Sequence, residues 1–294
     1  MSGADTPASA FSRLERFAAV GSTNDVVRRW LEDGTPEVCL AVADEQTAGR
    51  GRQDRTWTAP AGAALLLSAG FRPAWLAPDR AWRLGATAAL AMCDAAEEAA
   101  GLPDGSIRLK WPNDLVVEVR GPHALLAGVA STEEAVGRLA GPLELRKLAG
   151  VLGESDGLGT DDPRVVVGIG INADWAAADF PPELASAMTS LREASAGRPV
   201  DREALLDAFL GHLEARLEAL RAGYFDIATW TARQALTGSL VRLEGYAPHN
   251  GRDVAVEGVD ASSGALVVRE AAGGEPWPVV AGEVTHVRLA RDGA

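Results

Sequence analysis

The stretch Gly49-Arg50-Gly51-Arg52-Gln53-Asp54-Arg55-Thr56-Trp57 stands between two apolar runs, residues 38–43 and 63–71, that read as buried strands. It combines three arginines with a tryptophan, and its two glycines let the backbone turn freely. Arginine forks bind carboxylates and phosphates bidentately, and glycine lets main-chain N–H groups approach the same anion. Residues 49–57 therefore predict a cationic flap at the end of a strand. A solvated loop and a nucleic-acid-binding tract are the alternatives at this point.

The overall composition narrows these alternatives. Hydrophobic residues make up 47% of the 294 residues, which is enough for one large and one small domain or for two modest ones. The formal net charge of −13 argues against non-specific binding to nucleic acids or anionic membranes. Cys39 and Cys93 form no Cys-x-x-Cys pair, so we expect buried free thiols in a reducing compartment. Without a signal peptide or a bilayer-length apolar run, a soluble cytoplasmic protein is expected.

Lysine usage points to two further positions. Only Lys110 and Lys147 among the 28 basic residues are lysines, in a chain that otherwise uses arginine. A lysine kept in such a chain indicates a need for a compact ammonium group rather than a planar fork. Residues 107–111 read as a strand that stops at Pro112-Asn113-Asp114, and residues 147–154 read as a strand that opens on Lys147. Asn113 and Asp114 either build a turn or direct polar groups off a strand end, where α/β sites form.

The other elements follow from periodicity. Ser22-Thr23-Asn24 lies at the N-terminus of a helix expected over residues 23–33. These residues either only cap the helix or also form a site for a polar ligand. A long Ala-rich helix should follow Asp79 and end near Gly101. Residues 147–154 and 164–172 should form a hairpin, followed by helices at 201–221 and 226–236. Short β-type runs from residue 238 onward predict a small barrel-like domain.

Several function classes are excluded by missing motifs. Gly168-x-Gly170 fits a loose dinucleotide pattern, but no βαβ unit frames it, so we expect these glycines to let a ligand or another backbone approach closely. The histidines have no metal-ligand spacing, and neither a nucleophile elbow nor a P-loop is present. Cations at strand ends instead suit a reaction between two anions, such as attack of a carboxylate on the α-phosphate of ATP. A mobile flap closing over the labile product would exclude water.

Five motifs in order make the chain resemble the bacterial biotin–protein ligases, or biotin–[acetyl-CoA-carboxylase] ligases. They are Ser22-Thr23-Asn24, Gln46 with the flap, Lys110-Trp111-Pro112-Asn113-Asp114, Lys147-Leu148-Ala149-Gly150 and Gly168-x-Gly170-x-Asn172. The resemblance implies an α+β fold with a mixed-sheet catalytic domain at residues 13–237, which carries an insertion at about 120–146. A small SH3-like β-barrel would follow at residues 238–290, and residues 1–12 would be a disordered tail.

The resemblance also implies a two-step reaction. Biotin and ATP with Mg²⁺ would give biotinyl-5′-AMP, and biotin would then pass to a lysine of biotin carboxyl carrier protein. ATP would be a co-substrate, and no tightly bound cofactor is implied. The protein would be a monomer or homodimer with no nucleic-acid or membrane partner. It would lack the N-terminal DNA-binding domain of repressor-type members.

Residue roles follow from position within the motifs. The biotin-binding residues would be Ser22, Thr23, Asn24, Gln46, Gly49, Arg50, Gly51, Arg52 and Lys147. The ATP- and adenylate-binding residues would be Arg52, Arg55, Trp57, Lys110, Asn113 and Asn172, with Asn172 at the adenine. Asp114 would bind Mg²⁺, and Lys147 and Arg52 would be the catalytic cations.

Two rival functions accompany these predictions, and Asp54 adds a departure from the family pattern to the insertion and to the absent DNA-binding domain. A lipoate or octanoate ligase on the same fold would have no ureido group to satisfy with Ser22, Thr23 and Gln46. A non-catalytic regulator would hold biotin or its adenylate without turnover. Asp54 occupies a flap position that is usually glycine in the family, so its carboxylate is expected to weaken phosphate binding or stiffen the flap.

Overall fold

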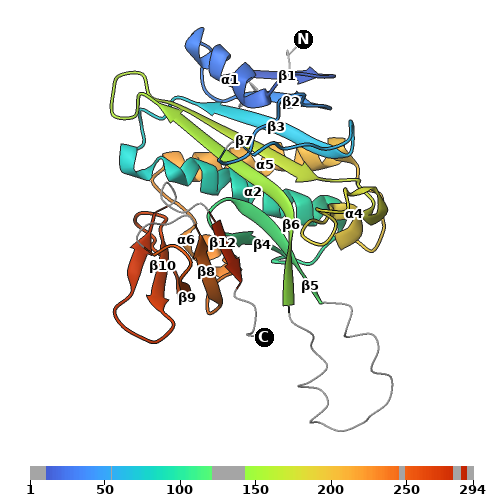
Figure 1. The fold of residues 1–294 in the computed structure, drawn as a ribbon. Helices are drawn as coiled ribbons and strands as arrows, with labels where there is room; N and C mark the ends of the chain where they lie inside the picture. Colours follow the sequence, from blue (N-terminus) through green and yellow to red (C-terminus); the bar gives the residue numbers. More distant parts are fainter. Residues whose placement is uncertain (1–10, 54, 121–142, 245–248, 281–285, 290–294) are drawn as a thin grey trace, which may run out of the picture.

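The computed structural model describes residues 11–53, 55–120, 143–244, 249–280 and 286–289, which form two sheets with flanking helices (Figure 1). The large sheet consists, in spatial order, of β1 (Arg13–Phe17), β2 (Cys39–Ala43), β3 (Ala64–Phe71), β7 (Arg164–Asn172), β6 (Leu143–Asp156), β5 (Asp114–Arg120) and β4 (Ile107–Lys110). β1 runs parallel to β2, and the other neighbours are antiparallel. The predicted mixed-sheet α+β class is confirmed.

One face of the large sheet is covered by α2 (Trp82–Ala100) and α5 (Arg202–Arg221). The many alanines of α2 let it lie close to the sheet, and Gly101 ends it in the left-handed conformation at φ 60°. Asp201 caps α5 by accepting hydrogen bonds from the backbone N–H groups of Glu203 and Ala204. Alternate residues of the central strands pack against these helices, among them Leu65, Leu67, Phe71, Val165, Val167 and Ile169. The main core therefore lies on this face.

The opposite face is only partly covered. α1 (Thr23–Glu32) packs Val27, Trp30 and Leu31 against the other set of alternating residues near β2. Beyond α1, this face presents the small residues Ser68, Gly150, Gly168 and Gly170. Because small side chains leave space above a sheet, this is the face on which a ligand can lie.

A β-bulge in β6 decides which residues reach that open face. Leu115 pairs with Ala149 but the next residue, Val116, pairs with Lys147, so Leu148 is an extra residue. Leu148 and Ala149 both enter the main core, and Lys147 lies on the open face together with Gly150. The expectation that Lys147 opens its strand is wrong, because β6 begins four residues earlier, at Leu143.

The second sheet is small and antiparallel, as the predicted SH3-like domain requires. Its spatial order is β11 (Trp277–Val279), β10 (Leu266–Glu270), β9 (Asp253–Val259), β8 (Leu240–Glu244) and β12 (His286–Leu289). Trp111, from the turn between β4 and β5, is buried in the core of this sheet. Its Nε1 donates a hydrogen bond of 3.0 Å to the Gly264 carbonyl oxygen. The small sheet thus anchors the turn that follows Lys110 and carries Asn113.

The remaining differences from expectation concern short or exposed elements. β1 was not predicted, since an edge strand of five residues with charged side chains has little periodic signal. β11 was also missed, and α6 (Ile227–Ala232) ends earlier than expected. A short α4 (Leu191–Ala194) and two 3-10 helices, η1 (Pro78–Arg80) and η3 (Ala177–Asp179), complete the helices of the described ranges. The ends of the expected insertion belong to β5 and β6, and residues 121–142 and 1–10 lie outside the described residues.

In the described parts, no helix has both the length and the apolar character needed to cross a membrane.

Candidate active site

A cavity of about 550 Å³ lies on the open face of the large sheet, within the size range of small-molecule sites. Most of the predicted site residues line it, although they come from five separate parts of the chain. These residues are Ser22, Thr23, Asn24, Gln46, Arg50, Gly51, Arg52, Arg55, Trp57, Lys110, Asn113, Asp114 and Lys147. Folding therefore brings the flap, the N-terminus of α1 and both lysines to one place.

Two predicted residues do not line this cavity. A Cβ atom on Gly49 would lie 2.4 Å from the Trp57 carbonyl oxygen, so glycine is needed where the two ends of the flap approach each other. The Asn172 side chain is fully buried, and its Nδ2 donates a 2.9 Å hydrogen bond to the Thr189 carbonyl oxygen. Asn172 thus anchors the segment beside Lys147, and its role at the adenine stays a prediction. Asp54 is outside the described residues.

The N-terminus of α1 forms a polar end of the cavity. Ser22 occupies the N-cap position, but its side chain makes no capping hydrogen bond, so capping alone does not account for this residue. The Thr23 backbone N–H donates to Gln46 Oε1 at 2.8 Å. Ser68 of β3, which was not predicted, lies 2.7 Å from Thr23 Oγ1 and 2.6 Å from Asn24 Oδ1. Buried hydroxyl and amide groups are held here in fixed directions.

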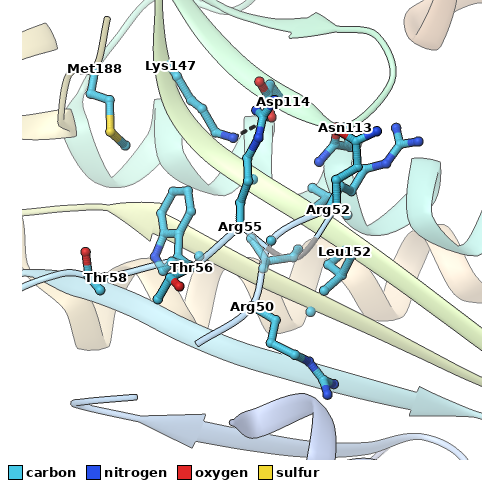
Figure 2. A pocket seen from close by; sticks show the side chains of 18 of the residues that line it. Arg50, Arg52, Arg55, Thr56, Thr58, Asn113, Asp114, Lys147, Leu152 and Met188 are labelled. Carbon is cyan, nitrogen blue, oxygen red and sulfur yellow. Dashed lines mark ion pairs between the residues drawn. The ribbon is translucent and has the colours of Figure 1, made fainter. Parts of the chain in front are cut away.

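Lys147 and Asp114 form the ionic centre of the cavity. Lys147 Nζ lies 2.7 Å from Asp114 Oδ1, as the dashed line in Figure 2 marks. The Lys147 backbone is held on its other side, because its N–H donates to the Ala187 carbonyl at 2.8 Å and its carbonyl accepts from Thr189 at 2.9 Å. Its ammonium group also lies 5.4 Å from the centre of the Trp57 ring. The cation is therefore positioned by both backbone and side-chain contacts.

Gly168 and Gly170 serve these side chains directly. A Cβ atom on Gly168 would lie 2.1 Å from Asn24 Oδ1, and one on Gly170 would lie 2.6 Å from Trp57 Nε1. The close approach predicted for the two glycines exists, and the groups that make it are the side chains of Asn24 and Trp57 rather than another backbone. Approach of a ligand at these glycines stays a prediction.

The flap arginines divide into two groups. Arg55 lies beside the Lys147–Asp114 pair, and Arg50 points away from it (Figure 2). Arg50 pairs instead with Glu154 at 3.1 Å and with Asp25 at 2.9 Å. Loss of solvent lowers the pKa of Arg52, nearby Arg55 lowers it further, and Asp114 opposes both effects. A desolvated guanidinium next to another cation attracts an anion.

Sequence reasoning missed several residues of this region. Two of them could have been suspected from the sequence. Ser68 is a lone polar residue in the apolar run of β3, and Glu154 is a charged residue near the end of β6. Leu184 and Met188 line the cavity from a segment without regular periodicity, which carried no signal. Across the described residues, no group of three or more His, Cys, Asp or Glu side chains is placed to hold a metal ion.

Comparison with known proteins agrees with this arrangement. Residues 17–172 match the model of the biotin/lipoate A/B protein ligase family. The biotin–[acetyl-CoA-carboxylase] ligase of Mycobacterium tuberculosis is 32% identical over 283 residues, which cover 95% of this chain and 91% of that protein. The enzyme of the same name from Paracoccus denitrificans is 33% identical, over 89% of this chain and 96% of that protein.

The fold also matches a solved structure. Biotin protein ligase from Aquifex aeolicus, in complex with biotin and ATP, superposes with a TM-score of 0.69 and 24% sequence identity. The superposition covers 95% of this chain and all of that one, so both sheets are included. Since the family model matches residues 17–172, which are more than half of the chain, the chain belongs to the biotin/lipoate A/B protein ligase family.

Proposed function

We propose that this protein is a biotin–[acetyl-CoA-carboxylase] ligase. It activates biotin with ATP to biotinyl-5′-AMP and transfers the biotinyl group to a lysine of a biotin carboxyl carrier protein. Relatives of this name match nearly the whole chain, and the described cavity has features that each step requires. We place the reaction in the cytoplasm, where ATP is abundant and the two free cysteines stay reduced.

One observation carries the proposal: a single cavity combines a polar end at α1 with an ionic centre at Lys147. A carboxylate and a triphosphate repel each other, so a site that joins them must neutralise both and hold them in line. Lys147, Arg52 and Arg55 supply cations at one end. The hydroxyl and amide groups at the other end suit a neutral polar ring system at the far end of the same acid.

We assign the biotin ureido group to Ser22, Thr23 and Gln46, because these groups can donate to its oxygen and accept from its two nitrogens. Lys147 then contacts the biotin carboxylate and the α-phosphate, and Arg52 retains the adenylate. The apolar chain of biotin runs between these two ends, beside the Trp57 ring that covers Gly170.

The nucleotide is assigned to the region around Arg55, Trp57, Lys110 and Asn113. ATP enters as MgATP, and Mg²⁺ bound by substrate phosphates needs only one or two protein carboxylates. Asp114 is the carboxylate available there, and the pair with Lys147 orients it. In the second step the acceptor lysine amine attacks the carbonyl carbon of the mixed anhydride. A C–N bond forms, the C–O bond to phosphate breaks, and AMP leaves.

The test uses purified protein with labelled biotin, MgATP and a biotin-carrier domain, in parallel with Lys147→Ala. Label should appear on the carrier with wild type, together with pyrophosphate release, and very little should appear with the variant. If wild type labels no carrier and releases no pyrophosphate, the proposal is wrong. Lipoate and octanoate in place of biotin test the related ligase function. Tight biotin binding without turnover, abolished by the same substitution, would instead indicate a regulator.

A further inference from the structure

Glu154 joins three parts of the site that are far apart in sequence. Its carboxylate accepts a 2.8 Å hydrogen bond from Asn24 Nδ2 at the start of α1. It also accepts from Arg28 at 2.7 Å and from the flap residue Arg50 at 3.1 Å. Glu154 is not among the residues that line the active-site cavity, although it lines a neighbouring cavity of the same volume that shares Asp114 with it. At the polar end of the active-site cavity it therefore acts through the residues that it contacts.

The contact with Asn24 sets the direction of a chain of hydrogen bonds. A carboxylate only accepts, so the amide nitrogen of Asn24 must face Glu154, and its Oδ1 must face Ser68. The Ser68 hydroxyl has a single hydrogen, which it donates to this oxygen. Ser68 Oγ is then left as an acceptor 2.7 Å from the Thr23 hydroxyl, which also lies 3.1 Å from Gln46 Oε1 and can donate to either oxygen. The contact with Glu154 thus fixes the roles of Asn24 and Ser68.

This direction reaches the proposed ureido site. Gln46 Oε1 is occupied by the backbone N–H of Thr23, so the Gln46 Nε2 donors are directed elsewhere. With Asn24 and Ser68 committed to each other, and the Thr23 hydroxyl shared between Ser68 and Gln46, the polar end has few alternative hydrogen-bond arrangements. Hydrogen-bond chains that end on a charge are polarised, which holds their direction more firmly. If the Asn24 amide were flipped, its nitrogen would face Ser68 and its oxygen would face the Glu154 carboxylate, so the directions of these hydrogen bonds would be reversed.

The contact with Arg50 concerns the flap. Arg50 has two carboxylate partners, Glu154 and Asp25, at 3.1 and 2.9 Å. In the described part of the chain, Asp25 forms no hydrogen bond with Asn24 or Ser68, and its other partner is Arg28 at 2.8 Å. The two carboxylates thus share the flap contact, whereas only Glu154 also holds the polar end. This difference separates the two effects experimentally.

We propose that Glu154 is a positioning residue that orients Asn24 and Ser68 for recognition of the biotin ureido group and holds the flap through Arg50. The inference rests on the proposed assignment of the cavity to biotin. Glu154 acts on the polar end through Asn24 and on the flap through Arg50. The substitution Glu154→Gln tests both contacts, because it keeps the shape of the side chain but replaces a group that only accepts hydrogen bonds with one that also donates. An amide at this position no longer forces the orientation of Asn24.

The experiment compares Glu154→Gln with Ser68→Ala and Asp25→Asn. Biotin affinity is measured by calorimetry without nucleotide, and adenylate release is measured by chasing labelled biotinyl-5′-AMP. We expect Glu154→Gln to weaken biotin roughly tenfold or more and to speed adenylate release, because it breaks charged hydrogen bonds. Ser68→Ala should weaken biotin with little effect on the flap. Asp25→Asn should speed release and leave biotin affinity as in wild type.

The controls separate this inference from the proposed function. All variants are checked for wild-type thermal unfolding, and the KM for ATP should change in Glu154→Gln no more than in Asp25→Asn, which loosens the same flap contact. A general loss of structure in Glu154→Gln would raise it further. If wild type binds biotin and Glu154→Gln binds it equally well, the positioning role is refuted and the ligase function stands. If wild type itself does not bind biotin, the proposed function fails first. An equal biotin loss in Asp25→Asn would also overturn the inference.

Discussion

Substitution of Gly170 by alanine should disturb the active site through Trp57. The added Cβ would lie 2.6 Å from Trp57 Nε1 and 2.7 Å from Cε2. Comfortable contacts between heavy atoms are about 3.5–4.0 Å, so the indole must move by roughly 1 Å. Gly150 supports the same ring from β6, where a Cβ would lie 3.3 Å from Trp57 Cζ3. The ring can therefore move only away from the sheet, towards the space proposed for the nucleotide.

The expected size of the effect follows from this displacement. Overpacking costs about 1–3 kcal/mol where the neighbours cannot move, which corresponds to a few degrees of melting temperature in a protein of this size. If the indole moves, the cost falls on the reaction, since a misplacement of about 1 Å can reduce the rate up to about 100-fold. We expect a fall in kcat/KM for adenylation of about 30- to 100-fold and a small loss of stability.

The assay is pyrophosphate release with saturating biotin and varied ATP, together with thermal unfolding. Gly153→Ala is the matched control, because a Cβ at this position of β6 has no heavy atom within 4 Å. It should behave as wild type. The double variant Gly170→Ala/Trp57→Phe, with a smaller ring, should recover the stability lost in Gly170→Ala. Equal kinetics in Gly170→Ala and Gly153→Ala would refute the reasoning, as would a stability loss that the smaller ring does not relieve.

Three further predictions concern separate parts of the molecule. Lys147→Met keeps most of the side-chain stem but removes the cation, so kcat/KM for adenylation should fall by about 10²- to 10³-fold in the same assay; a fall below about threefold would contradict its role. Arg233 is 8% exposed and bonded to both Glu97 oxygens, so Glu97→Gln leaves Asp94, at 2.8 Å, as its remaining carboxylate partner. Urea unfolding should show a loss of about 1.5–3 kcal/mol, and a change below about 0.5 kcal/mol would show that Asp94 alone compensates the buried charge. Burial raises the pKa of the Cys39 thiol from 9.0 to about 11, so Ellman's reagent should not label it in the folded protein at pH 8. Because the unfolded thiol ionises at lower pH, its contribution to stability should decline as pH rises from 9 towards 11, and Cys39→Ala should show a flatter pH dependence over that range.

The local patterns predicted most elements because each depends on neighbours in sequence. Alternation over residues 164–172 and helical spacing over 201–221 identified β7 and α5 nearly to their ends. Elements whose stability comes mainly from a partner were missed, as β1 and β11 show. The motifs likewise indicated most residues of the cavity, since glycine, arginine and lysine were present where an anion site needs them.

The geometry of the site could not be predicted from local patterns, because it depends on contacts between residues that are far apart in the sequence. Glu154 reaches Asn24 across 130 positions, and no local pattern encodes that pair. The need for glycine at positions 168 and 170 was visible, but the groups that approach them were not, because they belong to α1 and the flap.

The sequence by itself determined the kinds of residue in the site, their order along the chain and the strands that carry them. Tertiary structure decided the face on which Lys147 lies. Side chains alternate strictly along a strand, so Lys147 and Gly150, three positions apart, should lie on opposite faces. One extra residue at Leu148 brings them to the same face, and the position of that bulge depends on how β5 pairs with β6. Pairing between strands is a property of the folded sheet, which is why only the structure places the lysine beside Asp114.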